Sequence, residues 1–494
     1  MSTELLATIV AFASFFIMIS LQVRIALALG ISGFIGIVIL SGFGVGMSIL
    51  GSFPYSGSSK YTLFVIPMFI MLGSLVAHTG IGEAIFAAVN KVVGKVHGGL
   101  AASTAVAIGM FSGISGTSAA DIATFGRLSV TEMRRAGYHP AYAAAVTVAA
   151  GTFAVLIPPS VILLIFAVVA EQSAGKMLMA GLIPGVASCL ALIIFVVVRA
   201  YVGKETGTGG LRKFTGSKSL AISDLAPVGV AAGGSSAGET TMLLEAPAAS
   251  TVSKSRIPAA GIDLDLGVPQ KSRRFAGFSG IVYAGMLFAV VMGGMYSGLL
   301  TASEAGAWGA FAALLIVIFT SARPKGLTRR NVVSLALKET ANTTSMIFLL
   351  LICGSVFGFF AARAGLPQLV SDWTGQLNVP PQALILLFLL ILIPLGMFMD
   401  SLSILLLAGP VMLPIVDEMG FSLVWFGILM LKIIEIGLIT PPVGLNVFII
   451  SGITKLKAEG IYKKAVPFVL LDLALTFVFF LFPDLVMWLP NLVD

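Results

Sequence analysis

Two Pro-Pro pairs interrupt apolar segments that are otherwise long enough to cross a lipid bilayer. Pro441-Pro442 lies within about Val424–Ile450, and Pro158-Pro159 lies within about Tyr142–Ala170. Proline removes a backbone donor and clashes with the preceding helical turn, so an unbroken helix is not expected at either pair. One such site alone would also be compatible with a kinked helix. Two broken spans in corresponding halves of a membrane protein favour a secondary transporter with a binding site near the bilayer midplane.

The composition agrees with a protein that spans the membrane many times. The 494 residues are 58% hydrophobic and 10% charged, whereas soluble domains carry about 25% charged residues. The net charge of +7 does not indicate a nucleic-acid partner, because the cations lie in short loops between apolar runs. Cys189 and Cys353 lack the spacing of a disulfide framework or a metal site. We interpret Leu5–Leu21 as a retained first span and not as a cleaved signal.

The apolar runs of the N-terminal region predict three spans and one helix at the membrane interface. The spans are Leu5–Leu21, about Ile25–Leu50 and about Tyr61–Val76, with a Gly/Ser-rich loop at Gly51–Ser59. The segment Ile81–Val96 has an apolar face with lysines beside it, which is typical of an interfacial amphipathic helix.

Two further apolar segments contain polar interruptions and predict re-entrant hairpins. Gly98–Gly126 is interrupted at Ser112–Asp121 and has basic residues before and after it, which places both of its ends on one side of the membrane. The alternative is two complete, weakly apolar spans. Gln382–Val416 is interrupted at Gly396–Ser401, and span counting makes it open in the opposite direction. Ser112 and Pro158 are 46 residues apart, Met399 and Pro441 are 42 apart, and the two steps together indicate an inverted repeat.

These patterns predict an all-α polytopic membrane protein with two re-entrant hairpins and two Pro-Pro broken helices. We divide the chain into N-terminal spans with the interfacial helix (1–97), a first repeat core (98–199), a flexible cytoplasmic linker (200–275), second-half scaffold spans (276–380) and a second repeat core (381–494). Span counting places both chain termini on the periplasmic side.

Oxygen-rich groups gather at the hairpin tips and at the proline breaks, where carbonyls are released from helical hydrogen bonds. Sodium prefers such oxygen ligands. The predicted sodium site 1 contains Ser112, Ser115, Thr117, Gly151, Val155 and Pro158, and sodium site 2 contains Gly396, Met399, Asp400, Thr440 and Pro442. Any single Ser or Thr could instead bond its own helix. Because these oxygen-bearing residues cluster at both breaks, we favour ion sites over separate hydrogen bonds within each helix.

Ionisable and amide side chains within apolar segments are functional candidates. The predicted substrate contacts are Ser118, Asp121, Pro159, Ser401 and Asn446. Asp121 could alternatively add charge to a cation site. Lys432 and Glu435 are three residues apart, which indicates an internal ion pair; the alternative is a role in substrate or proton coupling. Glu304 begins its span, where a helix N-terminal role is the simplest interpretation.

The motifs at these breaks resemble the large membrane subunit of tripartite ATP-independent periplasmic (TRAP) transporters of the dicarboxylate type. They occur in the family's order in both halves: Ser112–Asp121, Glu132–Tyr138, Ile157–Ser160, Gly181–Gly185, Ser303–Ala305, Gly396–Asp400 and Glu435–Asn446. The chain departs from the family at Tyr201–Arg274, which is longer than the usual linker, and at Thr131, where proline is common.

The resemblance implies an elevator-type, sodium-coupled symporter in the bacterial inner membrane. It implies import of organic acids such as C4-dicarboxylates, with sodium as coupling ion and no other cofactor. The implied partners are a periplasmic substrate-binding protein and a separate small membrane subunit of four spans. A stand-alone anion/sodium symporter or sodium/proton antiporter of the same fold is the alternative. A membrane-embedded enzyme is disfavoured, since the three histidines form no HExxH motif and GxSxG is missing.

Overall fold

The computed structural model describes residues 3–203, 279–319, 328–369 and 380–492, and every regular element within them is a helix. A helix satisfies its backbone hydrogen bonds internally, which a span in lipid requires. Seven of the described helices are long and apolar enough to cross a membrane, and a bent helix pair could add an eighth span. The predicted all-helical membrane class is therefore confirmed. Most of the predicted linker, 204–275, lies outside the described residues.

The first half of the chain forms ten α-helices. They are α1 (Thr3–Ser20), α2 (Ile25–Ser41), α3 (Phe43–Ser58), α4 (Val65–Ala77), α5 (Ile81–Val93), α6 (Gly99–Ser115), α7 (Ser118–Arg135), α8 (Pro140–Ala154), α9 (Val161–Val169) and α10 (Ala174–Tyr201).

The described part of the second half begins with a helix that contains a π-helical turn and ends with a long helix followed by a short one. The elements are α11 (Ser279–Phe288), the π turn Ala289–Gly293, α12 (Gly294–Tyr296), α13 (Ala302–Phe319), α14 (Arg329–Arg363), α16 (Pro381–Phe398), α17 (Ser401–Glu418), α18 (Leu423–Gly437), α19 (Leu445–Thr454), α20 (Ala458–Leu481) and α21 (Asp484–Met487).

The order of a two-helix unit, a broken helix and a long helix occurs twice. Helices α6 to α10 make up the first copy and α16 to α20 the second. Both breaks contain a cis peptide bond, at Pro158-Pro159 and at Pro441-Pro442. The predicted repeat order is therefore present. The re-entrant placement of α6–α7 and α16–α17 in the bilayer stays a prediction.

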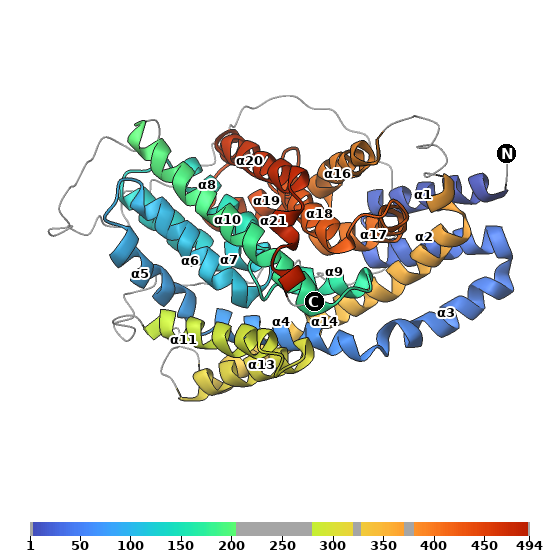
Figure 1. Ribbon diagram of the computed structural model, residues 1–494, viewed down its shortest axis with the longest axis horizontal. Coiled ribbons are helices and arrows are strands. Elements are labelled where there is room, and N and C mark those ends of the chain that lie inside the picture. The colour runs from blue at the N-terminus through green and yellow to red at the C-terminus, as the bar shows by residue number, and fades with distance from the viewer. Residues whose placement is uncertain (1–2, 204–278, 320–327, 370–379, 493–494) are drawn as a thin grey trace, which may run out of the picture. The chain divides into compact units, whose positions relative to one another are not determined.

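The described helices form two sets of contacts, one around α14 and one within the two repeat copies. Helix α14 packs along α2 and also contacts α3, α4 and α17, while α13 packs on α4 (Figure 1). Within the repeats, α8 contacts α6, α7 and α20, α16 packs on α18, and α19 packs on α7. The α7–α19 contact joins the first copy to the second, so residues from both copies can form one site.

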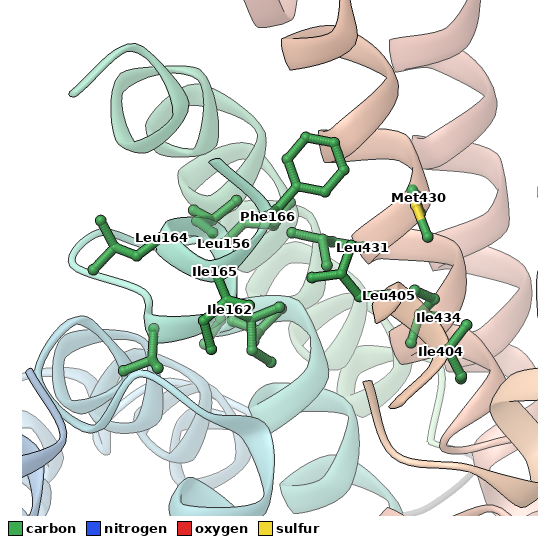
Figure 2. Packing of buried hydrophobic residues seen from close by; sticks show 14 of the residues in the cluster. Leu156, Ile162, Leu164, Ile165, Phe166, Ile404, Leu405, Met430, Leu431 and Ile434 are labelled. Atoms are coloured by element: carbon green, nitrogen blue, oxygen red, sulfur yellow. The ribbon is translucent and has the colours of Figure 1, made fainter. Parts of the chain in front are cut away.

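Apolar side chains fill the space between α9 and the second copy. Figure 2 shows Phe166 of α9 near Leu431 of α18, and both are buried; the Phe166 ring also packs against Gly427 of α18. Because α9 follows the first proline break, this layer fixes the first break against α18 of the second copy.

The structure corrects two predicted boundaries near the N-terminus. The predicted span Ile25–Leu50 is divided at Gly42, whose φ of +86° suits glycine and ends α2. The predicted loop Gly51–Ser59 is mostly the C-terminal part of α3. Its serines donate to carbonyls one turn earlier, with Ser52 Oγ 3.0 Å from Ser48 O and Ser56 Oγ 3.2 Å from Ser52 O. These bonds let a polar sequence remain helical.

Candidate ion- and substrate-binding site

The first two-helix unit is broken by a short turn of polar residues. Helix α6 ends at Ser115, and Gly116 follows in the left-handed conformation with φ of +74°, a common way to terminate a helix. Thr117 is extended and accepts a hydrogen bond from the Ala120 backbone N–H at 3.4 Å, so it caps α7. Ser112, Ser115 and Ser118 around this turn are buried.

The first proline break lies directly against this turn. Helix α8 ends at Ala154, and α9 starts at Val161 after Ser160, whose hydroxyl accepts from the Leu163 N–H at 3.5 Å. A Cβ added at Gly113 would lie 2.7 Å from the Pro158 carbonyl oxygen, and one at Gly151 would lie 3.4 Å from the Ser118 carbonyl oxygen. The turn that carries Ser112, Ser115 and Thr117 therefore lies against the break at Pro158, and Gly151 of α8 lies near the start of α7. Whether the residues of predicted site 1 bind sodium stays a prediction.

In the second copy the turn between the two helices again contacts the proline break, but its cap is the carboxylate of Asp400 and not a threonine hydroxyl. Asp400 separates α16 from α17 and caps α17 by accepting from the N–H groups of Leu402 at 3.2 Å and Ser403 at 3.3 Å. A Cβ at Gly396 would lie 2.8 Å from Gly437 Cα, at the end of α18. The Gly444 N–H donates to the Met397 carbonyl at 3.0 Å. The α16–α17 turn and the second break are thus in contact.

Two residues of predicted site 2 differ from their first-copy counterparts. Thr440 Oγ1 donates to the Ile436 carbonyl at 2.6 Å, so this hydroxyl already bonds the C-terminal end of α18. Pro442 is exposed at the second break, whereas Pro158 and Pro159 are buried at the first. Met399 lies in extended backbone between the helices and is buried.

A buried polar chain connects the two copies. Asn446 Nδ2 on α19 donates to Ser118 Oγ on α7 at 3.2 Å, and Ser401 Oγ on α17 donates to Glu435 Oε1 on α18 at 2.9 Å. The Ser118 hydroxyl also lies beside the Glu435 carboxylate. Ser115 donates to Asp121 on α7. Of the predicted substrate contacts, Ser118 and Ser401 therefore adjoin Glu435 and Asn446 joins the chain through Ser118, while Asp121 interacts with Glu435 by charge. Pro159 lies in the first break.

The predicted Lys432–Glu435 ion pair is wrong. Lys432 forms an ion pair with Asp472 of α20, and its Nζ also donates to Ser188 Oγ of α10 at 2.9 Å. The Phe153 ring centroid lies 5.0 Å from the same Nζ. Three residues of separation allow a helical ion pair, but Asp472 offers Lys432 a buried carboxylate partner on another helix. Asp472 was not predicted, because a lone Asp in an apolar run gives no sequence signal about its partner.

Comparison with known proteins assigns the family. A family profile described as "Tripartite ATP-independent periplasmic transporter, DctM component" matches residues 12–485. The chain belongs to the DctM family of TRAP transporters. The predicted resemblance is thereby confirmed over nearly the whole chain. Because the members of this family are transporter permeases, the comparison also agrees with the expectation of a carrier and not an enzyme.

The names of curated DctM relatives state different substrates. The C4-dicarboxylate TRAP transporter large permease protein of Pseudomonas aeruginosa is 28% identical over 466 residues, covering 94% of both chains. The sialic acid TRAP transporter large permease protein of Vibrio cholerae is 28% identical and covers 88% of both. An isethionate TRAP transporter permease of Oleidesulfovibrio alaskensis is 26% identical, covering 94% of this chain and 63% of that protein.

A solved structure shares the fold. The YdaH transporter of Alcanivorax borkumensis aligns with a TM-score of 0.54 at 16% identity, over 90% of this chain and 89% of that one. The DctM chain thus shares the fold of this solved transporter.

Proposed function

We propose that this DctM chain is the large membrane subunit of a sodium-coupled symporter that imports organic acids by an elevator mechanism. The observation that carries the proposal is the pair of matching contacts between a two-helix turn and a proline break, joined by the buried chain through Ser118, Glu435 and Ser401. A transporter needs its ion and substrate ligands near one another, because coupling is a free energy shared between two sites.

Sodium coupling is supported by the chemistry at the breaks. Backbone carbonyls at Gly151, Val155 and Pro158 lie where helical bonding is interrupted, and hydroxyl groups surround them. Hard cations favour oxygen ligands of this kind. The contact between Gly113 and Pro158 keeps both ligand sources within one site.

An organic acid as substrate is supported by the helix N-termini at the junction. Ser118 begins α7, Ser401 begins α17 and Asn446 lies in the first turn of α19. Helix N-termini carry partial positive charge and free N–H groups, which favour carboxylate or sulfonate groups. The substrates named for the three relatives described above, C4-dicarboxylates, sialic acid and isethionate, are all organic acids.

The proposed partners are a periplasmic substrate-binding protein and a small membrane subunit of four spans, in the bacterial inner membrane. The isethionate relative is named DctMQ, a name that combines two components. The match to this chain covers only 63% of that relative, so the relative contains an additional region. We infer that the equivalent of that additional region is supplied to this chain by a separate subunit.

Reconstitution into proteoliposomes tests the proposal. Vesicles would contain this chain alone, this chain with the small subunit, or both subunits with the binding protein outside. Uptake of labelled succinate, sialic acid and isethionate is measured with inward sodium or potassium gradients. We expect uptake of at least one acid that requires sodium and all three components.

Two results would contradict parts of the proposal. Uptake by this chain alone would indicate a stand-alone symporter or antiporter of the same fold. Equal uptake in sodium and potassium gradients would exclude sodium coupling while leaving organic-acid import in place.

A further inference from the structure

Four buried side chains around the junction between the copies have an oxygen without a hydrogen-bond partner. These atoms are Ser112 Oγ, Asp121 Oδ2, Glu435 Oε2 and Asn446 Oδ1. Ser112 and Asp121 are fully buried, and Glu435 and Asn446 are each 1% exposed. A buried oxygen without a hydrogen-bond partner destabilises the fold, and a charged oxygen does so more strongly. Ser112 lies beside the Asp121 carboxylate, so the oxygens that indicate a missing ligand are those of Asp121, Glu435 and Asn446.

The four side chains belong to one continuous cluster. Ser112 and Ser115 lie beside the Asp121 carboxylate, and Asp121 is close enough to Glu435 for the two charges to interact. The Ser118 hydroxyl adjoins Glu435 and accepts from Asn446 Nδ2. The cluster thus takes residues from α6, α7, α18 and α19, which belong to both copies.

The chemistry of the free atoms identifies the ligand as a cation. Three of them, on Asp121, Glu435 and Asn446, are carboxylate or amide oxygens that can accept but not donate. Among the described residues neither carboxylate forms an ion pair, because Lys432 pairs with Asp472 and acts on Glu435 only through its more distant charge. The N-termini of α7 and α17 supply partial positive charge. Serine hydroxyls lie beside both carboxylates, yet Asp121 Oδ2, Glu435 Oε2 and Asn446 Oδ1 have no hydrogen-bond partner.

We propose that Asp121 Oδ2, Glu435 Oε2 and Asn446 Oδ1 bind a sodium ion at the junction between the two copies. This junction site is additional to the two sites predicted at the turns and breaks. It changes the assignment of Asp121 and Asn446 from substrate contacts to cation ligands. It rests on the proposed sodium coupling and deepens it, because the ion would neutralise both carboxylates beside an anionic substrate.

Direct sodium binding to the purified full-length chain tests the junction site without substrate or partners. Protein in lipid nanodiscs would be titrated with radioactive sodium, and its melting temperature would be recorded with sodium or with choline. The variant is Glu435→Gln, and the matched control is Asp417→Asn, an exposed carboxylate on α17. We expect Glu435→Gln to bind one sodium ion fewer than the wild type and the control to bind the same number.

The melting temperature separates ion binding from a purely structural role. A ligand that binds only the folded state raises its stability. We expect Glu435→Gln to melt above the wild type in choline, because it removes a buried charge that has no ion-pair partner, and to gain less from sodium. A lower melting temperature in choline together with an unchanged gain from sodium would overturn the junction site.

The outcomes also distinguish this inference from the proposed function. If the wild type and Glu435→Gln bind the same number of sodium ions with the same affinity, the junction site alone is overturned. No sodium binding by the wild type overturns sodium coupling and the junction site together. If Glu435→Gln does not fold, Asn446→Leu is titrated with sodium in its place. This substitution should weaken sodium binding at one site by about tenfold or more. A binding isotherm equal to that of the wild type would overturn the junction site.

Discussion

Lys432 and Asp472 form a buried ion pair whose side chains are 2% and 1% exposed. Removing one member leaves the other charged and unpaired in a low-dielectric interior, which typically costs about 3–5 kcal/mol. We therefore predict that Lys432→Met strongly lowers the melting temperature of the detergent-solubilised protein. Lys432→Met combined with Asp472→Leu should recover a large part of the loss, because no unpaired charge remains.

The control for this prediction is Lys463→Met. Lys463 pairs with Glu459 one turn earlier, but both side chains are more than 70% exposed, and exposed pairs contribute little. We expect no measurable change in melting temperature. A double variant as unstable as Lys432→Met would show that the ion pair is not the cause of the loss.

Asp400 has two possible roles that substitution can separate. It caps α17 through the Leu402 and Ser403 N–H groups, and it is a predicted ligand of sodium site 2. Loss of a cap costs about 1 kcal/mol, whereas serine preserves most of a cap. We predict that Asp400→Ser and Asp400→Ala both raise the sodium concentration for half-maximal uptake. Normal sodium dependence in Asp400→Ser would leave only the capping role.

Side-chain partners were the least predictable feature of the site. The sequence placed Ser118, Asp121, Ser401 and Asn446 at breaks, and the structure gathers them around Glu435. Sequence spacing suggested a local partner for Lys432, but a long lysine side chain reaches across to another helix. Contacts between α18 and α20 depend on packing that no local pattern encodes.

At the level of elements, the contact between α16 and α18 depends on two glycines. A Cβ at Gly396 would approach Gly437 Cα to 2.8 Å and the Ile434 carbonyl oxygen to 2.9 Å. Both neighbours are backbone atoms that cannot rotate away. We predict that Gly396→Ala separates the α16–α17 turn from the second break and lowers both melting temperature and sodium-dependent uptake.

Gly452→Ala on α19 is the matched control, since no atom lies within 4 Å of its added Cβ. Alanine is favoured over glycine within helices by about 1 kcal/mol, so this variant should be as stable as the wild type or slightly more stable. Equal behaviour of the two variants would show that close approach at Gly396 is not needed.

Element breaks were predictable where proline or a polar turn interrupts an apolar run. The breaks at 155–160 and 438–444 follow from the Pro-Pro pairs, because proline cannot continue the helical hydrogen bonds. Gly51–Ser59 was predicted wrongly as a loop. Its serines bond to carbonyls within α3, and composition alone does not reveal this.

At the scale of the whole molecule, the long segment between the halves is the main departure from the family. Its composition of Gly, Ser, Ala and Pro with scattered charges predicts a flexible connection, and it lies outside the described residues. We predict that deleting Thr208–Val268 leaves uptake in the three-component proteoliposomes nearly unchanged. Lost uptake with normal membrane insertion would assign this segment a function. A scrambled segment of equal length serves as the control.

The sequence allowed the repeat order to be predicted because the same interruptions recur at similar spacing in both halves. It could not provide the contact of α14 with α2, or of α19 with α7, since these join segments far apart in the chain. The predicted domain boundaries and the periplasmic placement of the termini stay predictions.

The Lys432–Asp472 pair also has an electrical consequence. The two charges sum to zero, so the membrane potential would exert no net force on them during the movement of α18 and α20 in the proposed elevator mechanism. A single charge crossing the bilayer would exchange about 2.3 kcal/mol with the field per 100 mV. A chain without Asp472 would carry the Lys432 charge through that field, and voltage would then act directly on the rate of its transport cycle.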